Sequence, residues 1–263
     1  MQGSTVELSH EEYRTAWHAL GLGMRHWNLD LPGLSELTKE QWRVQVDCTL
    51  DGLRARGLAD RRGVVPALAE ALRVLARPGR EINGWVQTGG AQVRLLAGSR
   101  GEYGVLALLD AHRLVVHTGA AGGLCMAVAR LLPDRPAGPG SSVSVSSELL
   151  SRPARDGQSG LTGEQLENLL TRGGTKPADA RSFAAMMRGP QHGGGKFGAA
   201  RRDRLGKRHS AGVPVAYLAT EHGGYTLQPL RGPDGTGWTT LAPATLAQVA
   251  QRIDQLIDGI RTG

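Results

Sequence analysis

The chain has few aromatic residues, few lysines, few cysteines and no long apolar run. Aromatic residues make up 4% of its 263 residues, and it contains only two cysteines, Cys48 and Cys125. A secreted protein of this size more often carries several cysteines at framework spacings, so we expect a reducing cytoplasm and two buried thiols. The most apolar window, residues 114–132, contains His117 and Arg130 and is too polar to span a bilayer. Disulfide scaffolds and membrane spans are therefore excluded.

The start of the chain also lacks the features of a secretory signal. The first residues, MQGSTVELSHEEY, have no basic start and no apolar core. The remaining composition, 40% hydrophobic and 21% charged with 38 glycines, is that of a globular protein with material for one large domain or two small ones. The basic residues are nearly all arginine, which is typical of a high-GC coding bias; the lysines are Lys39, Lys176, Lys196 and Lys207.

Helices are predicted at the start of each half of the chain. Ser9 with Glu12, and Thr38 with Gln41, have the spacing of capping boxes. Prolines at the first helical position begin two further helices. The predicted helices run from about 9 to 20, 38 to 57, 66 to 77, 122 to 132 and 161 to 172, then from Pro177, and finally from 244 to 260.

Strand-like runs follow the helices in both halves. Residues 105–109 are apolar at every position, so we expect both faces of that strand to be covered. A short strand is also predicted at 27–31, and Val143 and Val145 alternate as in an extended strand. The other predicted strands are 82–88, 92–97, 103–109, 114–118, 197–202, 214–220 and 225–230.

The two halves repeat the order helix, helix, several strands, helix. The segment 133–147 has turn composition and divides the chain, so we expect one domain, 1–263, with an N-terminal half 1–147 and a C-terminal half 148–263. The motif Leu-x-x-Arg-Gly occurs at 53–57 and again at 169–173. Two copies favour a pseudo-twofold α+β domain in which one sheet is flanked by two helical clusters.

No catalytic or metal-binding pattern stands out. The stretch 138–142 lacks the second glycine of a hydrolase elbow, and 193–196 lacks the flanking residues of a phosphate loop, so the latter is read as a flexible glycine turn before a strand. Asp110 and His112 are expected to form a solvated turn, and the eight histidines have no metal-ligand spacing. We therefore expect no enzyme activity, no metal and no cofactor. The aromatic residues at core-like positions, which favour packing over ligand stacking, are Tyr13, Trp17, Trp42 and Trp85.

The net charge of +7 is concentrated in one segment. Residues 196–209 carry six basic residues against the single acid Asp203, and Phe197 is their only aromatic residue. Single-strand nucleic-acid binders interleave aromatic and basic residues, and that pattern is missing here. A mobile, solvated hairpin is the simplest interpretation; a patch for an acidic protein partner and a nucleic-acid contact are the alternatives.

Several short segments, taken in order, carry a family resemblance. They begin with Val6-Glu7-Leu8-Ser9 and Glu12-Tyr13-x-x-x-Trp17-x-x-Leu20-Gly21-Leu22-Gly23, followed by Leu53-x-x-Arg56-Gly57-Leu58 and Leu75-Ala76-Arg77-Pro78. The connector reads Leu131-Leu132-Pro133 and Pro136-x-Gly138-Pro139-Gly140-x-Ser142-Val143-Ser144-Val145. The last segments are Phe197-Gly198-Ala199-Ala200-Arg201, Gly223-Gly224-Tyr225 and Trp238-Thr239-Thr240-Leu241-Ala242-Pro243.

In this order, over nearly the whole chain, the segments resemble the EspG family, cytoplasmic chaperones of type VII (ESX) secretion in mycobacteria and related actinobacteria. The resemblance implies a central, mainly antiparallel sheet with a helical bundle on each side. It also implies binding to the apolar helical tip of PE/PPE substrate heterodimers, which keeps them soluble and directs them to the secretion machine. By position, the partner-binding residues it implies are Gly98, Ser99, Arg100, Gly101, Glu102, Tyr103, Met187, Arg188, Phe197 and Tyr225.

Overall fold

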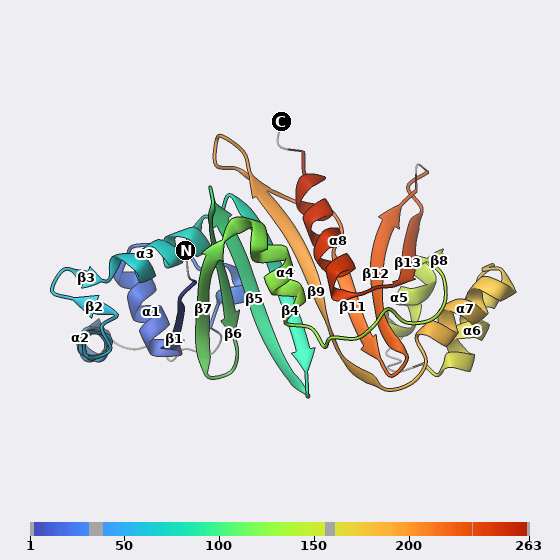
Figure 1. Cartoon of the computed structure of the whole chain (residues 1–263), viewed down its shortest axis with the longest axis horizontal. Coiled ribbons are helices and arrows are strands. Elements are labelled where there is room, and N and C mark those ends of the chain that lie inside the picture. Colours follow the sequence, from blue (N-terminus) through green and yellow to red (C-terminus); the bar gives the residue numbers. More distant parts are fainter. Residues whose placement is uncertain (1–2, 32–38, 156–160, 233, 262–263) are drawn as a thin grey trace.

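One large antiparallel sheet runs through the computed structural model of the chain, which describes residues 3–31, 39–155, 161–232 and 234–261. The strands of the first half are β1 (Thr5–Ser9), β4 (Arg80–Thr88), β5 (Ala91–Arg100), β6 (Tyr103–Leu109) and β7 (Arg113–Ala120). Those of the second half are β8 (Val143–Ser146), β9 (Gln191–Arg202), β10 (Arg208–Ser210), β11 (Val215–Thr220), β12 (Gly223–Arg231) and β13 (Gly237–Pro243). Their order is β1-β7-β6-β5-β4-β9-β11-β12-β13-β8, with β10 paired to β9 (Figure 1).

The described helices form a group at each end of the sheet and a pair over its middle. The first group is α1 (His10–Ala19), α2 (Lys39–Ala55) and α3 (Pro66–Ala76), with the 3-10 helix η1 (Trp27–Leu29) and the hairpin β2 (Ala59–Asp60) and β3 (Gly63–Val64). The other group is α5 (Ser147–Arg155), α6 (Gly163–Arg172) and α7 (Pro177–Met186). The central pair is α4 (Leu124–Ala129), preceded by the 3-10 helix η2 (Ala121–Gly123), and α8 (Leu246–Asp258).

The strand register places the two end groups on one face of the sheet and the central pair on the other. Leu109, which packs in the core under α1–α3, is in register with Arg94, Trp85 and Lys196, and that row continues to Leu227, which packs against the core under α5–α7. The opposite face contributes a third core beneath α4 and α8. The middle of the first face therefore lies between the two end groups.

The order of elements is the same in the two halves. Each runs strand, three helices, a set of strands that crosses back through the sheet, and a final helix, and the halves meet where β4 pairs with β9. This order is what the predicted internal repeat requires; the two-fold relation itself, and the division after residue 147, stay predictions. β8 precedes the predicted boundary after residue 147 but is grouped with the second half because it pairs with β13.

Most predicted elements are confirmed, and the capping boxes at Ser9 and Thr162 have both of their hydrogen bonds. Thr38 lies outside the described residues. The strand predicted at 27–31 is wrong. Residues 27–29 are a 3-10 helix, in which the Asn28 amide donates a hydrogen bond to His26 Nδ1. The helix predicted at 122–132 is shorter, because residues 121–123 form η2 and α4 ends at Ala129. Strand β1 and helix α5 were not predicted.

Three further expectations are corrected. Gly193 to Lys196 is not a flexible turn but part of β9, where glycines allow close approach of neighbouring backbones. Cys48 is exposed on α2 and Cys125 is half-buried, so the thiols are free but not both buried. Tyr13 and Trp17 are core residues, whereas Trp85 is half-buried; the side chain of Trp42 lies outside those described.

Candidate functional site

A groove lies on the open middle of the sheet, between the two end groups of helices. Its floor is formed by β4, β9 and β11, and its volume is about 650 Å³. Trp85 and Gln87 line it from β4, Met187 from the end of α7, and Leu227 from β12. Glycines 193–195 lie on the floor, so little but backbone stands in its deepest part.

Glycine is required at positions 194 and 195 because the neighbouring strands leave no room for a side chain. A Cβ added at Gly194 would lie 2.4 Å from the carbonyl oxygen of Tyr217, and one added at Gly195 would lie 2.8 Å from that of Trp85. Side chains are therefore excluded from this part of β9 by the adjacent strands. In the sequence, the groove is marked by the three glycines 193–195, a pattern that by itself predicts a turn.

The 3-10 helix η1 packs on β4 and β5, next to the strands that form the floor of the groove. The Asn28 side chain is buried and donates hydrogen bonds to the carbonyl oxygens of Gly84 (2.9 Å) and Leu95 (2.7 Å), which fixes η1 on β4 and β5. Arg94, the register neighbour of Trp85, donates to the Asp30 carbonyl at 2.7 Å. The Trp27 side chain, by contrast, is 64% exposed. The exposed Trp27 ring lies next to the His26 ring, with 5.2 Å between their centroids, and does not line the groove.

The chemistry of the groove is that of a binding surface. Its titratable lining residues are His192 and Lys196, with Tyr217 bonded to the Pro133 carbonyl at 3.3 Å, and no carboxylate lines it. General acid–base or nucleophilic chemistry needs converging groups of complementary character. A surface of this composition suits an apolar or weakly acidic segment of another protein.

A buried carboxylate lies further along the same face of β4. Glu81 accepts from Arg208 Nη2 at 2.6 Å and from Asn83 Nδ2 at 2.8 Å, and His26 Nε2 lies 3.1 Å from it. Burial alone raises the pKa of Glu81, but the neighbouring His26 and Arg208 outweigh it and lower that pKa to about 2. Glu81 therefore ties the N-terminal segment and β10 to the central strand as a fixed anion.

The partner-binding residues expected from sequence lie in three separate places. Gly98, Ser99 and Arg100 end β5, Gly101 and Glu102 form the tight turn, and Tyr103 begins β6; Ser99 is buried, and Arg100 donates to the Arg77 carbonyl at 3.1 Å. Met187 and Arg188 follow α7, and Met187 lines the groove. Phe197 is fully buried beneath α8, and Tyr225 is buried under α5–α7 with its hydroxyl bonded to the Pro139 carbonyl. Only Met187 of this set lines the groove.

The β5–β6 turn and the groove lie near opposite ends of strand β4. Arg80, at the start of β4, is in register with Ser99, whereas Thr88, at its end, is in register with Gly193. Eight residues of strand separate the two positions, which corresponds to about 26 Å. One partner segment cannot contact both unless it extends along the sheet.

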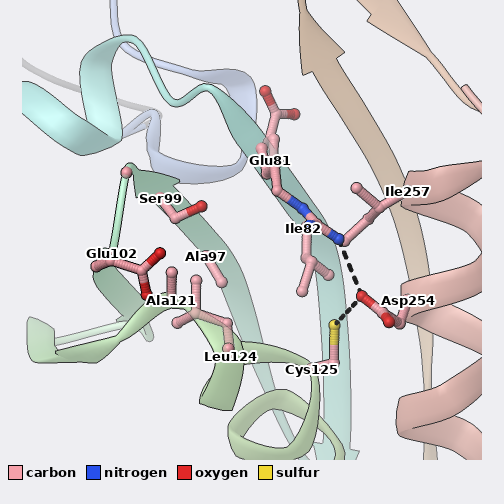
Figure 2. A pocket seen from close by; sticks show the side chains of 13 residues that line it. Glu81, Ile82, Ala97, Ser99, Glu102, Ala121, Leu124, Cys125, Asp254 and Ile257 are labelled. Carbon is pink, nitrogen blue, oxygen red and sulfur yellow. Dashed lines mark hydrogen bonds and ion pairs between the residues drawn. The ribbon is translucent and has the colours of Figure 1, made fainter. Parts of the chain in front are cut away.

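The turn covers a second, smaller cavity of about 230 Å³ (Figure 2). Two of the titratable groups that line it pair with each other, since Arg80 Nη2 lies 3.0 Å from Asp254; the same nitrogen lies 3.1 Å from Asp258. The Cys125 thiol points at Asp254, at 3.7 Å, and burial first, then this carboxylate, raises the pKa of the thiol to about 11. A protonated thiol is a poor nucleophile, so this cavity offers no activated group.

Asp110 and His112 form a turn and not a catalytic pair. The Asp110 side chain accepts from the backbone amides of His112 (2.7 Å) and Arg113 (2.9 Å), as an Asx turn does. The arrangement agrees with the solvated turn expected from the sequence.

Both the sequence and the fold of the chain match known proteins. The model of the EspG family matches residues 9–255, and the chain therefore belongs to the EspG family. Among solved structures it is similar to the Mycobacterium tuberculosis type VII secretion system chaperone EspG5, determined in complex with a PE25-PPE41 dimer, with a TM-score of 0.71 and 15% identity over 99% of this chain and 98% of that one. At this identity the likeness shows the fold. No curated protein sequence matches the chain.

In the part of the chain that the structure describes, no helix is both long enough and apolar enough to cross a membrane.

Proposed function

We propose that this chain is a chaperone of type VII secretion that binds the apolar helical tip of a PE/PPE-type heterodimer in the central groove. The observation that carries the proposal is membership of the EspG family over residues 9–255, together with the fold shared along the whole chain with a chaperone solved on a PE/PPE dimer. A cytoplasmic location and the absence of catalysis follow from this role.

The size of the groove supports this assignment. Neighbouring strands are spaced about 4.8 Å apart, so the three strands of the floor place its outer two about 10 Å apart. An α-helix with its side chains is about 10 Å wide. The floor therefore suits the end of one helix or a helix–helix corner lying along β9, with Trp85, Met187 and Leu227 against its apolar side chains.

The physical benefit to the client is the removal of exposed apolar surface from water. An exposed apolar tip is an aggregation hazard, and a chaperone that binds only the folded tip stabilises the dimer by mass action. Release needs only competition for the same tip, since no nucleotide or covalent step takes part.

Co-expression with PE/PPE-type pairs from the same genome tests the proposal. We expect one such pair to co-purify with a tag placed on the chaperone, as a complex with one copy of each chain. The folded chaperone failing to retain any of these pairs would contradict the proposed function.

Matched variants then locate the interface. Met187→Glu places a charge in the groove, Arg100→Glu alters the β5–β6 turn at the other end of the sheet, and Gln251→Glu changes an exposed position on α8, on the opposite face. An unpaired charge in a binding interface costs several kcal/mol. We expect Met187→Glu to weaken client binding at least about tenfold and Gln251→Glu to leave it unchanged. The response of Arg100→Glu decides whether the client also extends to the turn.

A further inference from the structure

The hairpin formed by β9 and β10 is a charged surface that the groove does not use. Residues 201–208, which leave out the groove residue Lys196, carry five basic residues against the single acid Asp203, a net charge of +4 out of +7. The tip of the hairpin, residues 203–207, projects beyond the sheet near the C-terminal end of α8 (Figure 1). The groove lies at the other end of β9, about ten residues or 33 Å away along the strand. A partner at the tip would therefore leave the groove free.

The hairpin tip is held in one conformation by its only acidic residue. Asp203 Oδ1 accepts from the backbone amides of Leu205 and Lys207, both at 2.9 Å, and His209 Nε2 lies 2.8 Å from Asp203 Oδ2. Gly206 has a φ of +81°, a conformation that closes the turn and that favours glycine. The hairpin tip is thus a folded turn whose carboxylate is used internally, and the mobility expected from the sequence stays a prediction.

The cations of the hairpin divide into structural and displayed ones. Arg208 is bonded to the buried Glu81, and Arg202 Nη1 donates to the Gly206 carbonyl at 2.9 Å. Arg204 and Lys207 are exposed, and Leu205 between them is 95% exposed. Two cations and one apolar side chain are therefore presented to solvent on a rigid turn.

A cleft runs alongside this turn. It has a volume of about 400 Å³ and lies between residues 209–213 and the end of α8, with Leu256 and Ile260 among its lining residues and Arg261 at its edge. Within the described chain β10 pairs only with β9, so its outer edge has no strand partner. An unpaired strand edge beside a cleft with a mixed polar and apolar lining is an arrangement that accepts an extended peptide by strand addition.

We propose that the β9–β10 hairpin and the adjacent cleft bind an extended acidic segment of a protein partner other than the groove-bound client. Acidic side chains of the segment face Arg204 and Lys207, and apolar ones enter the cleft towards Leu256 and Ile260. On α8, the carboxylates of Asp254 and Asp258 both pair with Arg80, which leaves one net negative charge at that place.

The surface favours a peptide over a nucleic acid. Unstructured nucleic acids gain affinity by stacking bases on aromatic rings, and no aromatic residue occurs between Gly198 and Val213. The one ring there, that of His209, is held by Asp203. The exposed Leu205 and the cleft residues Leu256 and Ile260 instead match apolar side chains spaced along a polypeptide.

The test uses a fluorescein-labelled peptide of twelve residues that contains glutamate, aspartate and two leucines, and measures its binding to the full chain by anisotropy. We expect binding that weakens steeply as salt is raised, because the contacting charges are exposed. We expect Arg204→Glu/Lys207→Glu to weaken it at least about tenfold, since each exposed charge contact contributes a fraction of a kcal/mol and two are reversed. Leu205→Ser should weaken it less.

The matched control is Arg61→Glu/Arg62→Glu, which makes the same change of charge at the exposed β2–β3 turn and should leave binding unchanged. Equal weakening by the control, or no peptide binding at low salt, overturns the proposal. Tighter binding of a labelled 20-nucleotide poly(dT) than of the peptide overturns it in favour of nucleic acid. Client binding in the groove is measured separately by co-purification, so failure of the groove function and failure of the hairpin proposal are distinguishable.

Discussion

At the scale of single residues, Glu81 is the position where burial and charge conflict most. Its side chain is 3% exposed, yet it stays ionised because His26, Asn83 and Arg208 surround it. These three come from the N-terminal segment, β4 and β10, which are far apart in the sequence. A buried carboxylate held by partners from three elements stabilises their relative arrangement, and loss of one member leaves the others buried and unpaired.

Replacing this carboxylate should make stability less dependent on pH. The folded pKa of about 2 lies below the usual value of 4.5, so the stabilisation is present above about pH 4.5 and is lost as pH falls towards 2. The difference corresponds to about 3 kcal/mol. We expect Glu81→Gln to lower the free energy of unfolding by about this amount at pH 7, and the gap from the unchanged protein to shrink between pH 4.5 and pH 2.5, in urea titrations.

Glu70→Gln is the control, because Glu70 and Arg73 are both about half-exposed and 4.0 Å apart. Its effect should stay below about 0.5 kcal/mol. A Glu81→Gln protein as stable as the unchanged one at pH 7 would show that the buried cluster does not stabilise the fold.

Gly194 is a second position where one residue decides local structure. Its substitution by alanine would press a methyl group against the Tyr217 carbonyl at 2.4 Å. We expect Gly194→Ala to lower the free energy of unfolding by about 1–3 kcal/mol in thermal or urea unfolding. Gly212→Ala, where no atom lies within 4 Å of the added carbon, serves as the control. Equal stability of the two variants would refute the packing explanation for the glycine run.

At the scale of elements, the β9–β10 turn shows how one side chain organises a loop. The hydrogen bond from His209 is the main cause that lowers the pKa of Asp203, and the amides of Lys207 and Leu205 add to it. The carboxylate is thus kept as an acceptor to a pH below the usual range of aspartate, and the turn loses this support as pH falls through that lowered pKa. The folded turn also fixes the spacing of Arg204 and Lys207.

Removal of that side chain should loosen the turn without unfolding the protein. We expect Asp203→Ala to speed hydrogen exchange at the Leu205 and Lys207 amides by about tenfold, because a lost hydrogen bond is worth about 1 kcal/mol. Asp234→Ala, which removes a similar contact to the Thr236 amide in the β12–β13 turn, should leave these two amides unchanged. Unaltered exchange at Leu205 in the Asp203 variant would contradict the assigned role.

Local patterns in the sequence predicted local structure well and tertiary packing less well. The capping box at Ser9 and the prolines at 66 and 177 marked helix starts because those signals lie within one turn of the chain. The apolar residues of 27–31 predict a strand, whereas the 3-10 helix at 27–29 is fixed by Asn28, which donates to carbonyls of β4 and β5 that are distant in the sequence. The glycines of β9 resemble a turn, since their cause, the neighbouring strands, comes from distant residues.

The same limit applies to the candidate site. Of the partner-binding residues that the family resemblance implies, Met187 lines the groove, and its contact with a partner stays a prediction; Phe197 and Tyr225 are core residues, whose burial depends on which strand face they occupy. The groove itself, with Trp85 from β4 and Leu227 from β12, arises from strand order and could not be found from spacing along the chain. The positive charge of residues 196–209 can be read from the sequence. The sequence does not show that Arg208 pairs with the buried Glu81 while Arg204 and Lys207 are exposed to solvent.

At the scale of the whole molecule, the sheet presents two faces with different tasks. One is filled at its middle by α4 and α8, whereas the other is left open between α1–α3 and α5–α7, and the groove lies there. The open part coincides with the junction of the two halves, where β4 meets β9. The central claim is that this junction binds the client.

Hydrogen exchange of the chaperone alone and with its co-purified client tests that claim most directly. The account predicts that client binding slows exchange in segments 85–90 and 187–196, while segment 246–258 on the opposite face is unchanged. Slower exchange along α8, with none in the groove segments, would contradict it.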